Sequence, residues 1–224
     1  MSLTIYQVPI SPYCISTLQA LKALRASVKI VNVNYATRDE VIQASGGKYY
    51  AVPLLKDRSR VVMESSGDSQ DIARYIDRKF GKGKLFPSKL EGLQSIILHH
   101  LENDVEGISF QLADPFFLPT LKDIQTRTLA IRHKERKFGA GCIAQWKKDR
   151  KAIQAKVDAM LLSYDKILRH SDFLFGSEPV YSDFMLFGVI GNFTFNGWNK
   201  LNPKFKALIR WNKRMGQFRY KASK

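Results

Sequence analysis

Residues 3–17 read LTIYQVPISPYCIST, a β-rich run closed by Pro9 and followed by the start of a helical pattern. Leucines then recur at helical spacing, so the sequence predicts a strand over 3–8 and a helix over about 12–25. Ser11 falls at or beside the N-cap of that helix. A cysteine there would have completed a Cys-Pro-Tyr-Cys dithiol, but the chain has a serine.

The pattern continues as a compact α/β unit and then changes character. Further β-rich runs at 28–33, 52–55 and 61–63, and an apolar helical face after Asp68, predict a mixed sheet with helices over residues 1–80. Residues 81–88 (GKGKLFPS) have the composition of a linker. From residue 89 to 224 the periodicity is helical, which predicts an all-α helical bundle. Its expected helices are 89–113, 120–138, 144–170, 182–195 and 203–215.

Bulk composition restricts the class of protein. With 45% hydrophobic residues, 224 residues can bury a large core, so disorder is not expected. Two cysteines, Cys14 and Cys142, are too few for a disulfide scaffold and favour a reducing compartment. No secretory leader or apolar run long enough for a membrane span is visible, so we expect a soluble, cytoplasmic protein.

The formal net charge is +16, and the basic excess extends through the C-terminal region. After Asp183 the sequence has nine Lys or Arg residues and no acidic residue. Such a field attracts anions, including nucleic acid and anionic surfaces. A solvated basic surface without a partner explains the charge equally well, and we favour that interpretation.

Three positions could carry chemistry. Ser11 would face the unpaired N–H groups and positive dipole end of a helix, where an anion or thiolate is stabilised; serine is also an ordinary N-cap. Val52-Pro53 opens a strand with a proline, which indicates either a cis bond turned toward a ligand or an edge strand. Asp68-Ser69 could grip an amino-acid-like ligand, or simply cap a helix.

Taken together and in order, four segments resemble the glutathione transferase superfamily. They are SPYC at 11–14, AVPLL at 51–55, DSQDIARYID at 68–77 and PVYSDFMLFG at 179–188. The resemblance covers nearly the whole chain. It implies a thioredoxin-like N-terminal domain, which binds glutathione, followed by a helical domain that binds the acceptor substrate.

The resemblance also implies roles for individual residues. Ser11 matches the serine whose hydroxyl stabilises the glutathione thiolate, whereas members that reduce mixed disulfides have a cysteine there. The other matching residues are Val52, which pairs through its main chain, Pro53 as the cis-proline, Asp68 and Ser69 for the γ-glutamyl group, and Lys48 for the glycyl carboxylate. The helical domain departs from the family at its capping box, where Val180 replaces the hydroxyl residue and Asp183 is kept.

The acceptor pocket is harder to predict. Tyr13 follows the Ser11 turn, and an aromatic cluster lies at the end of a predicted helix, so the candidates are Tyr13, Phe110, Phe116 and Phe117. Plain core packing is the competing interpretation of that cluster. Cys14 lies one turn into its helix, where we expect a buried, inert thiol. The four histidines have no metal-ligand spacing, so no metal is expected.

The leading hypothesis is therefore a glutathione transferase that conjugates the glutathione thiolate to a small apolar electrophile. Glutathione is its co-substrate, and the resemblance implies a homodimer. One alternative is a non-catalytic module of this fold that serves protein assembly or binds polyanions. Another is glutathione-dependent reductive or ether-cleaving chemistry.

Overall fold

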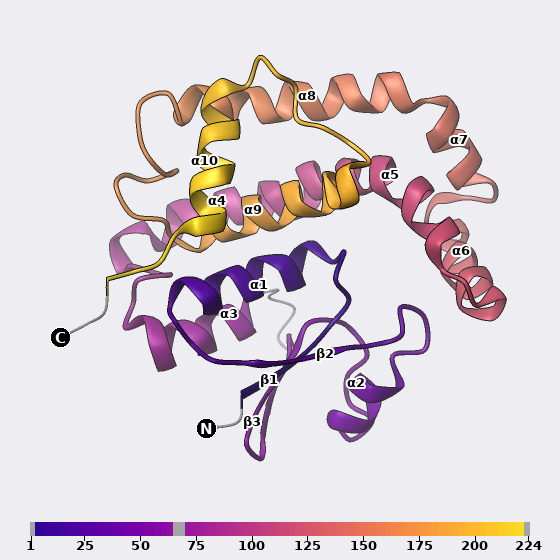
Figure 1. Ribbon diagram of the computed structural model, residues 1–224, viewed down its shortest axis with the longest axis horizontal. Coiled ribbons are helices and arrows are strands. Elements are labelled where there is room, and N and C mark those ends of the chain that lie inside the picture. Colours follow the sequence, from indigo (N-terminus) through magenta and orange to yellow (C-terminus); the bar gives the residue numbers. More distant parts are fainter. Residues whose placement is uncertain (1–2, 65–69, 222–224) are drawn as a thin grey trace.

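The computed structural model describes residues 3–64 and 70–221. Its N-terminal part is a four-stranded sheet with three short helices, which lies below a layer of long helices in the view of Figure 1. The strands are β1 (Leu3–Gln7), β2 (Lys29–Asn32), β3 (Leu54–Asp57) and β4 (Arg60–Val62). The helices of this part are α1 (Pro12–Ala23), α2 (Asp39–Ala44) and α3 (Asp71–Ile76).

The sheet is mixed, as predicted. Its order is β2-β1-β3-β4, with β1 parallel to β2 and antiparallel to β3. Ile5 of β1 lies opposite Ile30 on one side and Leu55 on the other. Ile5 and Leu55 are fully buried, whereas Ile30 on the edge strand is half exposed. The central pair therefore forms the core of this part, and the β1–α1 turn emerges at one end of it.

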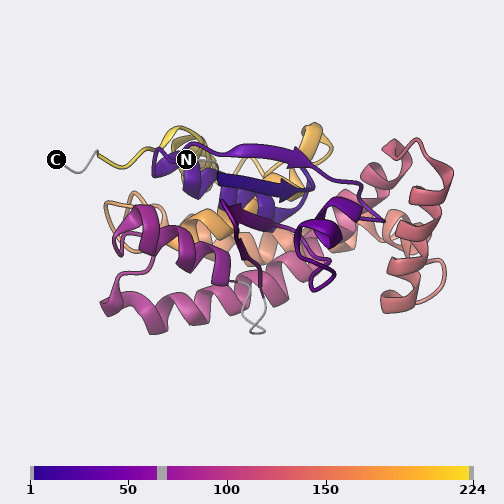
Figure 2. The ribbon, with the colours of Figure 1, turned by 90° about the horizontal axis from the view of Figure 1, so that it is seen from below.

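From Ser88 onward the elements are helical (Figures 1 and 2), which confirms the all-α second part predicted from the sequence. They are α4 (Glu91–His100), α5 (Glu106–Phe117), α6 (Ile124–Phe138), α7 (Cys142–Lys148), α8 (Arg150–Ile167), α9 (Tyr181–Phe193) and α10 (Lys206–Gln217). A π-helical turn, Leu101–Val105, joins α4 to α5 in one long run. The helix predicted over 144–170 is instead divided at Asp149, whose φ and ψ of −86° and 7° interrupt the helical path.

Helix α1 lies directly against α9, and this contact joins the two parts (Figure 1). Two glycines of α9 allow the close approach. A Cβ added at Gly188 would lie 2.2 Å from the carbonyl oxygen of Pro12, and one at Gly191 would lie 3.0 Å from the side chain of Ile15. Because no side chain fits at Gly188, the start of α1 is held against the middle of α9.

Val180 has no hydroxyl group with which to cap α9, and Asp183 fixes the start of this helix instead. Its carboxylate accepts hydrogen bonds from the backbone N–H groups of Leu174 at 2.9 Å and Val180 at 3.1 Å, and from the Trp211 indole at 3.0 Å. Burial raises the pKa of Asp183 to about 6, although these bonds oppose the shift. The helix start is therefore tied to α10 as well as to its own backbone.

The predicted linker, residues 81–88, is anchored at its centre. The Asp77 carboxylate accepts from the backbone N–H groups of Leu85 and Phe86, both at 3.0 Å, and Leu85 is fully buried. The division at 81–88 remains a proposal. Across the described ranges, no helix has both the length and the apolar character needed to cross a bilayer.

Candidate active site

The turn before α1 presents Ser11 at the helix N-terminus. Its backbone N–H donates to the carbonyl of Val8 at 2.9 Å, and its extended backbone (φ −62°, ψ 125°) leads into Pro12 at the first helical position. The Ser11 Oγ accepts a long hydrogen bond from the backbone N–H of Cys14 at 3.4 Å. Ser11 is thus the N-cap of α1, and its side chain also lies within hydrogen-bonding range of the Cys14 thiol.

A side chain from the helical part holds this turn from behind. The Asn192 amide of α9 donates to the carbonyl of Ile10 at 2.9 Å, in a buried contact. The other atom of that amide, Asn192 Oδ1, is buried without a hydrogen-bond partner among the described residues. The residue preceding Ser11 is therefore fixed by α9.

The neighbouring thiol is not available for chemistry. Cys14 is fully buried. Burial raises the pKa of Cys14 to about 11, although hydrogen bonding from the Ser11 side chain lowers it. The thiol therefore stays protonated at neutral pH, as expected for an inert buried cysteine.

The Val52-Pro53 peptide is cis. Val52 and Ser11 line the same cleft, of about 590 Å³, between the two parts of the molecule. The structure therefore brings together two of the predicted site residues, which are 41 positions apart in the sequence. The lining residues are Val8, Ile10, Ser11, Pro12, Tyr13, Tyr35, Ala36, Arg38, Tyr50, Ala51, Val52, Glu106, Phe110, Asp114, Leu129, Ala130, His133, Lys134, Arg136, Lys137 and Asn192.

The opposite wall comes from one face each of α5 and α6. On α5, Glu106, Phe110 and Asp114 recur every four residues, and therefore point the same way. On α6, Ala130, His133, Lys134 and Lys137 lie at i, i+3, i+4 and i+7, which also places them on one helical face. This wall is strongly charged.

One pair of opposite charges on this wall is neutralised. The Lys134 ammonium lies 2.6 Å from the Asp114 carboxylate, and both side chains are largely buried. Burial lowers the pKa of Lys134, but Asp114 and Tyr35 outweigh it, so the net pKa is raised and the lysine stays charged. The Lys134 ammonium also lies 4.3 Å from the centroid of the Phe110 ring. The pair therefore links α6 to α5 through side chains.

Glu106 is the other carboxyl group of this wall. It directly follows the π-helical turn Leu101–Val105, a type of distortion that is frequent at functional sites. Burial raises the pKa of Glu106 to about 7, while the positive charge of Lys134 opposes the shift. Burial, followed by the Glu106 charge, also raises the pKa of Tyr13. Glu106 therefore changes its charge near neutral pH.

The cleft carries a positive potential on its α6 side. Burial lowers the pKa of His133, and the positive charges of Lys134, Arg136, Arg38 and Lys137 lower it further. Four cations therefore act together on the His133 imidazole. An anion brought to that position would be stabilised.

The N-terminal wall supplies one of these cations, Arg38. Its backbone is left-handed (φ 53°), and its guanidinium donates to the carbonyl of Tyr35 at 3.1 Å and to that of Tyr50 at 3.3 Å. The same group lies 4.8 Å from the centroid of the Tyr50 ring. In the described residues Arg38 has no carboxylate partner, so its charge is not neutralised.

Comparison with known proteins agrees with this geometry. Residues 5–84 match the family described as "Glutathione S-transferase, N-terminal domain". The whole chain superposes on glutathione transferase GSTFuA3 from Phanerochaete chrysosporium with a TM-score of 0.79, 14% identity, and coverage of 100% of this chain and 99% of the other. The chain has the glutathione transferase fold. The family match of the N-terminal part and the fold of the whole chain together confirm the resemblance predicted from the sequence.

Two further structures extend the likeness to the glutathione transferase fold. One is glutathione transferase CsGST83044 of Ceriporiopsis subvermispora in complex with glutathione (TM-score 0.76, 19% identity, 97% of each chain). The other is glutaredoxin 2 from Salmonella typhimurium, also with glutathione (TM-score 0.73, 21% identity, 96% of this chain and 93% of that one). No curated protein matches the sequence.

Within this fold, the predicted site residues fall into two groups. Ser11, Val52, Tyr13 and Phe110 line the interdomain cleft together. Phe117 is close to it, since its ring packs edge-on against Tyr35 with centroids 4.8 Å apart.

The remaining predicted residues lie elsewhere. Phe116 is exposed and stacks on Trp198, facing a smaller cavity of about 200 Å³. Lys48 is exposed in the segment after α2 and is not among the residues that line the cleft. Asp68 and Ser69 lie outside the described residues.

Sequence reasoning did not find the charged wall or Arg38. The repeat of Glu106, Phe110 and Asp114 at four-residue spacing was visible in the sequence, and it would have marked one face of a helix. Nothing in the sequence placed that face opposite Ser11. Arg38 lies in a segment without regular periodicity, so no pattern drew attention to it.

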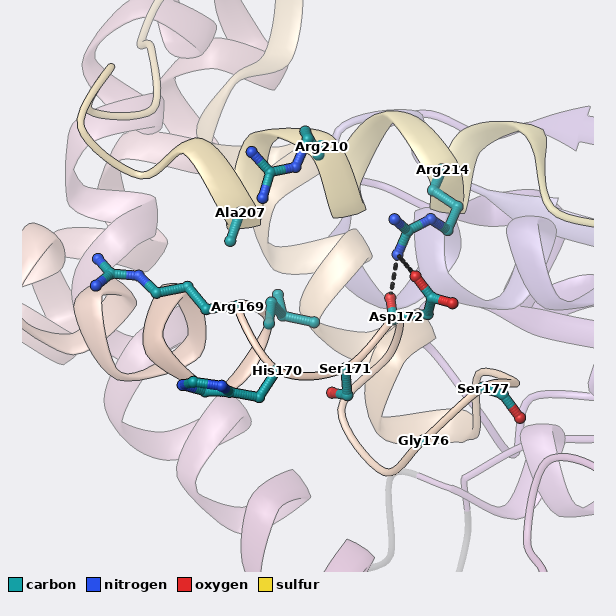
Figure 3. A pocket seen from close by; sticks show the side chains of 10 residues that line it. Arg169, His170, Ser171, Asp172, Gly176, Ser177, Ala207, Arg210 and Arg214 are labelled. Carbon is teal, nitrogen blue, oxygen red and sulfur yellow. Dashed lines mark hydrogen bonds and ion pairs between the residues drawn. The ribbon is translucent and has the colours of Figure 1, made fainter.

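A second basic cavity, of about 510 Å³, lies between the end of α8 and α10 (Figure 3). Its arginines are partly neutralised: Arg214 pairs with Asp172 at 3.0 Å, and Arg169 pairs with Asp165 at 2.8 Å. Figure 3 shows that the guanidinium groups of Arg169, Arg210 and Arg214 do not converge on one point. The interdomain cleft is therefore the better candidate for an active site.

Proposed function

We propose that this protein is a glutathione transferase that holds the sulfur of glutathione beside Ser11 and transfers it to an electrophile bound against α5 and α6. The observation that carries the proposal is the position of Ser11. Its hydroxyl caps α1, at the edge of a cleft that both parts of the molecule line. The family match of residues 5–84 and the shared fold support glutathione as the thiol.

The chemistry rests on ionising a thiol. A free thiol with a pKa of roughly 8.5 is mostly protonated at neutral pH, and each unit by which the pKa falls requires about 1.4 kcal/mol of preferential thiolate stabilisation. The Ser11 hydroxyl would donate to the sulfur, and the N-terminus of α1 and the charge of Arg38 would favour its negative charge. The thiolate then forms a carbon–sulfur bond, while the leaving group departs with its bonding electrons.

The rest of glutathione would lie along the N-terminal wall. We retain the roles predicted for Val52 and Pro53, and for the γ-glutamyl grip of Asp68 and Ser69. The glycyl carboxylate has two candidate partners, Arg38 and Lys48. Arg38 is favoured, because it faces the cleft with an unpaired charge, whereas Lys48 does not line the cleft.

A calorimetric titration with glutathione tests this proposal. We expect saturable binding with a Kd no weaker than about 1 mM, the upper end of ordinary KM values, and accelerated conjugation of an activated aryl chloride. Arg38→Gln should weaken glutathione binding about fivefold, the value of a modest ion pair, while Lys48→Gln should change it less. The reverse order would assign the carboxylate to Lys48.

No glutathione binding, with salt-sensitive retention on an immobilised polyanion, would instead support the non-catalytic alternative. The basic region after Asp183 favours that alternative. Glutathione-dependent acceleration in solution would contradict it.

We also propose a cytoplasmic homodimer. Both cysteines are free thiols, in accord with a reducing compartment. Leu93 and Ile96 of α4 are 53% and 67% exposed, and they lie one helical turn apart on a face that a second copy could cover. Light scattering on the separated species should give a mass twice that of one chain. The Ile96→Glu variant should instead have the mass of the monomer.

A further inference from the structure

Positive charge is concentrated on the α6 side of the cleft. His133, Lys134, Arg136 and Lys137 all line the cleft from this one helix. The Lys134 charge is matched by Asp114 at 2.6 Å. Arg136 and Lys137 form no ion pair with a carboxylate in the part of the chain that the structure describes.

The acid nearest to these cations in sequence is directed elsewhere. Glu135 pairs with Arg132 at 3.2 Å, and its other oxygen accepts from the backbone N–H of Gly141 at 3.0 Å. Glu135 therefore belongs to the face of α6 away from the cleft. It does not neutralise Arg136 or Lys137.

The remaining carboxyl group of this wall offsets these charges only in part. Burial raises the pKa of Glu106 to about 7, so partial protonation weakens its negative charge near neutral pH. His133 lies on α6 with Lys134, Arg136 and Lys137, while Arg38 acts on it from across the cleft. Glu106 and Asp114 of α5 line the same cleft. Together these groups leave an excess of positive charge on the α6 side.

We propose that the acceptor electrophile is an activated aromatic compound with a leaving group, which also bears an anionic group such as a carboxylate that lies against Arg136 and Lys137. Its ring would contact Tyr13, Phe110 and Leu129, which line the same cleft. This inference rests on the proposed function, and it replaces the small apolar electrophile expected from the sequence with a charged one.

In the reaction, the anionic group positions the acceptor and forms no bond. The glutathione thiolate adds to the ring carbon, the carbon–sulfur bond forms, and the leaving group departs with the electron pair of the broken bond. For an aryl chloride the leaving group is chloride. Arg136 and Lys137 thus act on binding of the acceptor rather than on the sulfur.

Two matched acceptors test the inference. They are 4-chloro-3,5-dinitrobenzoate and 4-chloro-3,5-dinitrobenzamide, which share the reacting carbon and leaving group and differ in charge. Each kcat/KM is divided by the uncatalysed rate with glutathione, so that intrinsic reactivity cancels. We expect this ratio to favour the benzoate about tenfold at low salt, the combined effect of two exposed charge contacts, and to decline as salt screens them.

The double variant Arg136→Gln/Lys137→Gln should reduce the preference to about twofold. The control Arg132→Gln/Lys148→Gln removes the same charge from exposed positions outside the cleft, and it should keep the preference. An equal decline in both variants would assign the effect to the overall charge of +16 and overturn the local site. A wild-type protein without preference would overturn it as well.

Binding without chemistry separates this inference from the proposed function. 3,5-Dinitrobenzoate and 3,5-dinitrobenzamide have no leaving group, and their affinities can be measured by following the ring protons of His133, assigned with a His133→Gln variant. The benzoate should bind more tightly and raise the pKa of His133, and the cleft double variant should lose both effects. Equal binding of the two compounds would overturn the inference even if glutathione is conjugated. Failure to bind glutathione, with the benzoate preference intact, would overturn only the transferase proposal.

Discussion

The wall of the cleft that the N-terminal part supplies is made of apolar, aromatic and hydroxyl side chains with one cation, Arg38, whereas α5 and α6 supply most of the charged side chains. Ser11 sits at a helix cap, and Val52 belongs to a tight backbone turn, so both positions follow from a few local dihedral angles. Glu106 and Lys134 reach into the cleft from two helices whose relative placement depends on packing.

This difference separates two tasks. A site made of backbone and a capped helix end is rigid and suits a constant ligand, which we propose is glutathione. A wall of charged side chains can be altered one residue at a time without disturbing the helices that carry it, which suits a variable acceptor. The contact of α1 with α9 keeps the two walls in register.

The largest expected effect comes from disturbing that contact. Gly188→Ala places a methyl group 2.2 Å from the Pro12 carbonyl oxygen, so α1 and α9 must move apart. We expect the free energy of unfolding to fall by about 3 kcal/mol, the upper end of overpacking costs. Urea titration measures this loss.

The control for this substitution is Gly216→Ala on α10. A Cβ there would lie 4.0 Å from the nearest side-chain atoms, in ordinary contact. Alanine should stabilise this helix position by about 0.5–1 kcal/mol. Equal stability of the two variants would show that the α1–α9 contact is looser than the structure indicates.

The N-terminal wall alone is tested by Ser11→Ala. Loss of the hydroxyl donor should raise the pKa of bound glutathione by 1–2 units, and so slow conjugation at neutral pH about 10- to 100-fold. Ultraviolet difference titration of the thiolate and steady-state rates measure the two effects. Cys14→Ala should retain the rate, because the buried thiol does not face the ligand. If only Cys14→Ala abolished the rate, the roles of the two residues would be reversed.

The same difference between the walls explains how far the sequence could be interpreted. The strand, the Ser11 cap, the mixed sheet and the helical character after residue 88 follow from periodicity and local chemistry, and the structure confirms them. The Val52-Pro53 dipeptide alone left two conformations open; the family resemblance implied the cis form, and the structure has it.

The charged wall depends on contacts that no local pattern contains. The Lys134–Asp114 pair, for example, joins residues in different helices. Phe116 and Phe117 illustrate the same limit. These adjacent residues of one predicted cluster have different partners, since the Phe116 ring stacks on Trp198 and the Phe117 ring packs edge-on against Tyr35.

The charged wall is tested by the pH dependence of stability. The pKa of Glu106 rises from 4.5 to about 7 on folding, so the folded protein binds more protons between these values. Stability therefore falls as pH rises from about 4.5 to 7. Glu106→Gln stays neutral, and it should exceed the wild type by on the order of 1–2 kcal/mol at pH 8 after allowance for partial exposure, with little difference near pH 5.

Urea titrations at about pH 5 and 8 measure this difference. The control Glu40→Gln alters an exposed carboxylate on α2 and should leave the pH dependence of the wild type unchanged. A Glu106→Gln variant that is less stable at the higher pH would show that the carboxylate is held charged by its neighbours. The helical wall would then be more nearly neutral than we infer.

The smallest expected effect belongs to the hydrogen bond that joins α9 to the N-terminal wall. Asn192→Ala removes the 2.9 Å contact to the Ile10 carbonyl, and it should cost about 1 kcal/mol of stability. Because Ile10 precedes Ser11, the variant should also raise the thiolate pKa of bound glutathione and lower kcat, with little change in glutathione Kd. The control Asn212→Ala, on α10, should alter none of these. A loss of stability in Asn192→Ala without a shift in the thiolate pKa would mean that α9 supports the fold of the turn but does not orient its serine.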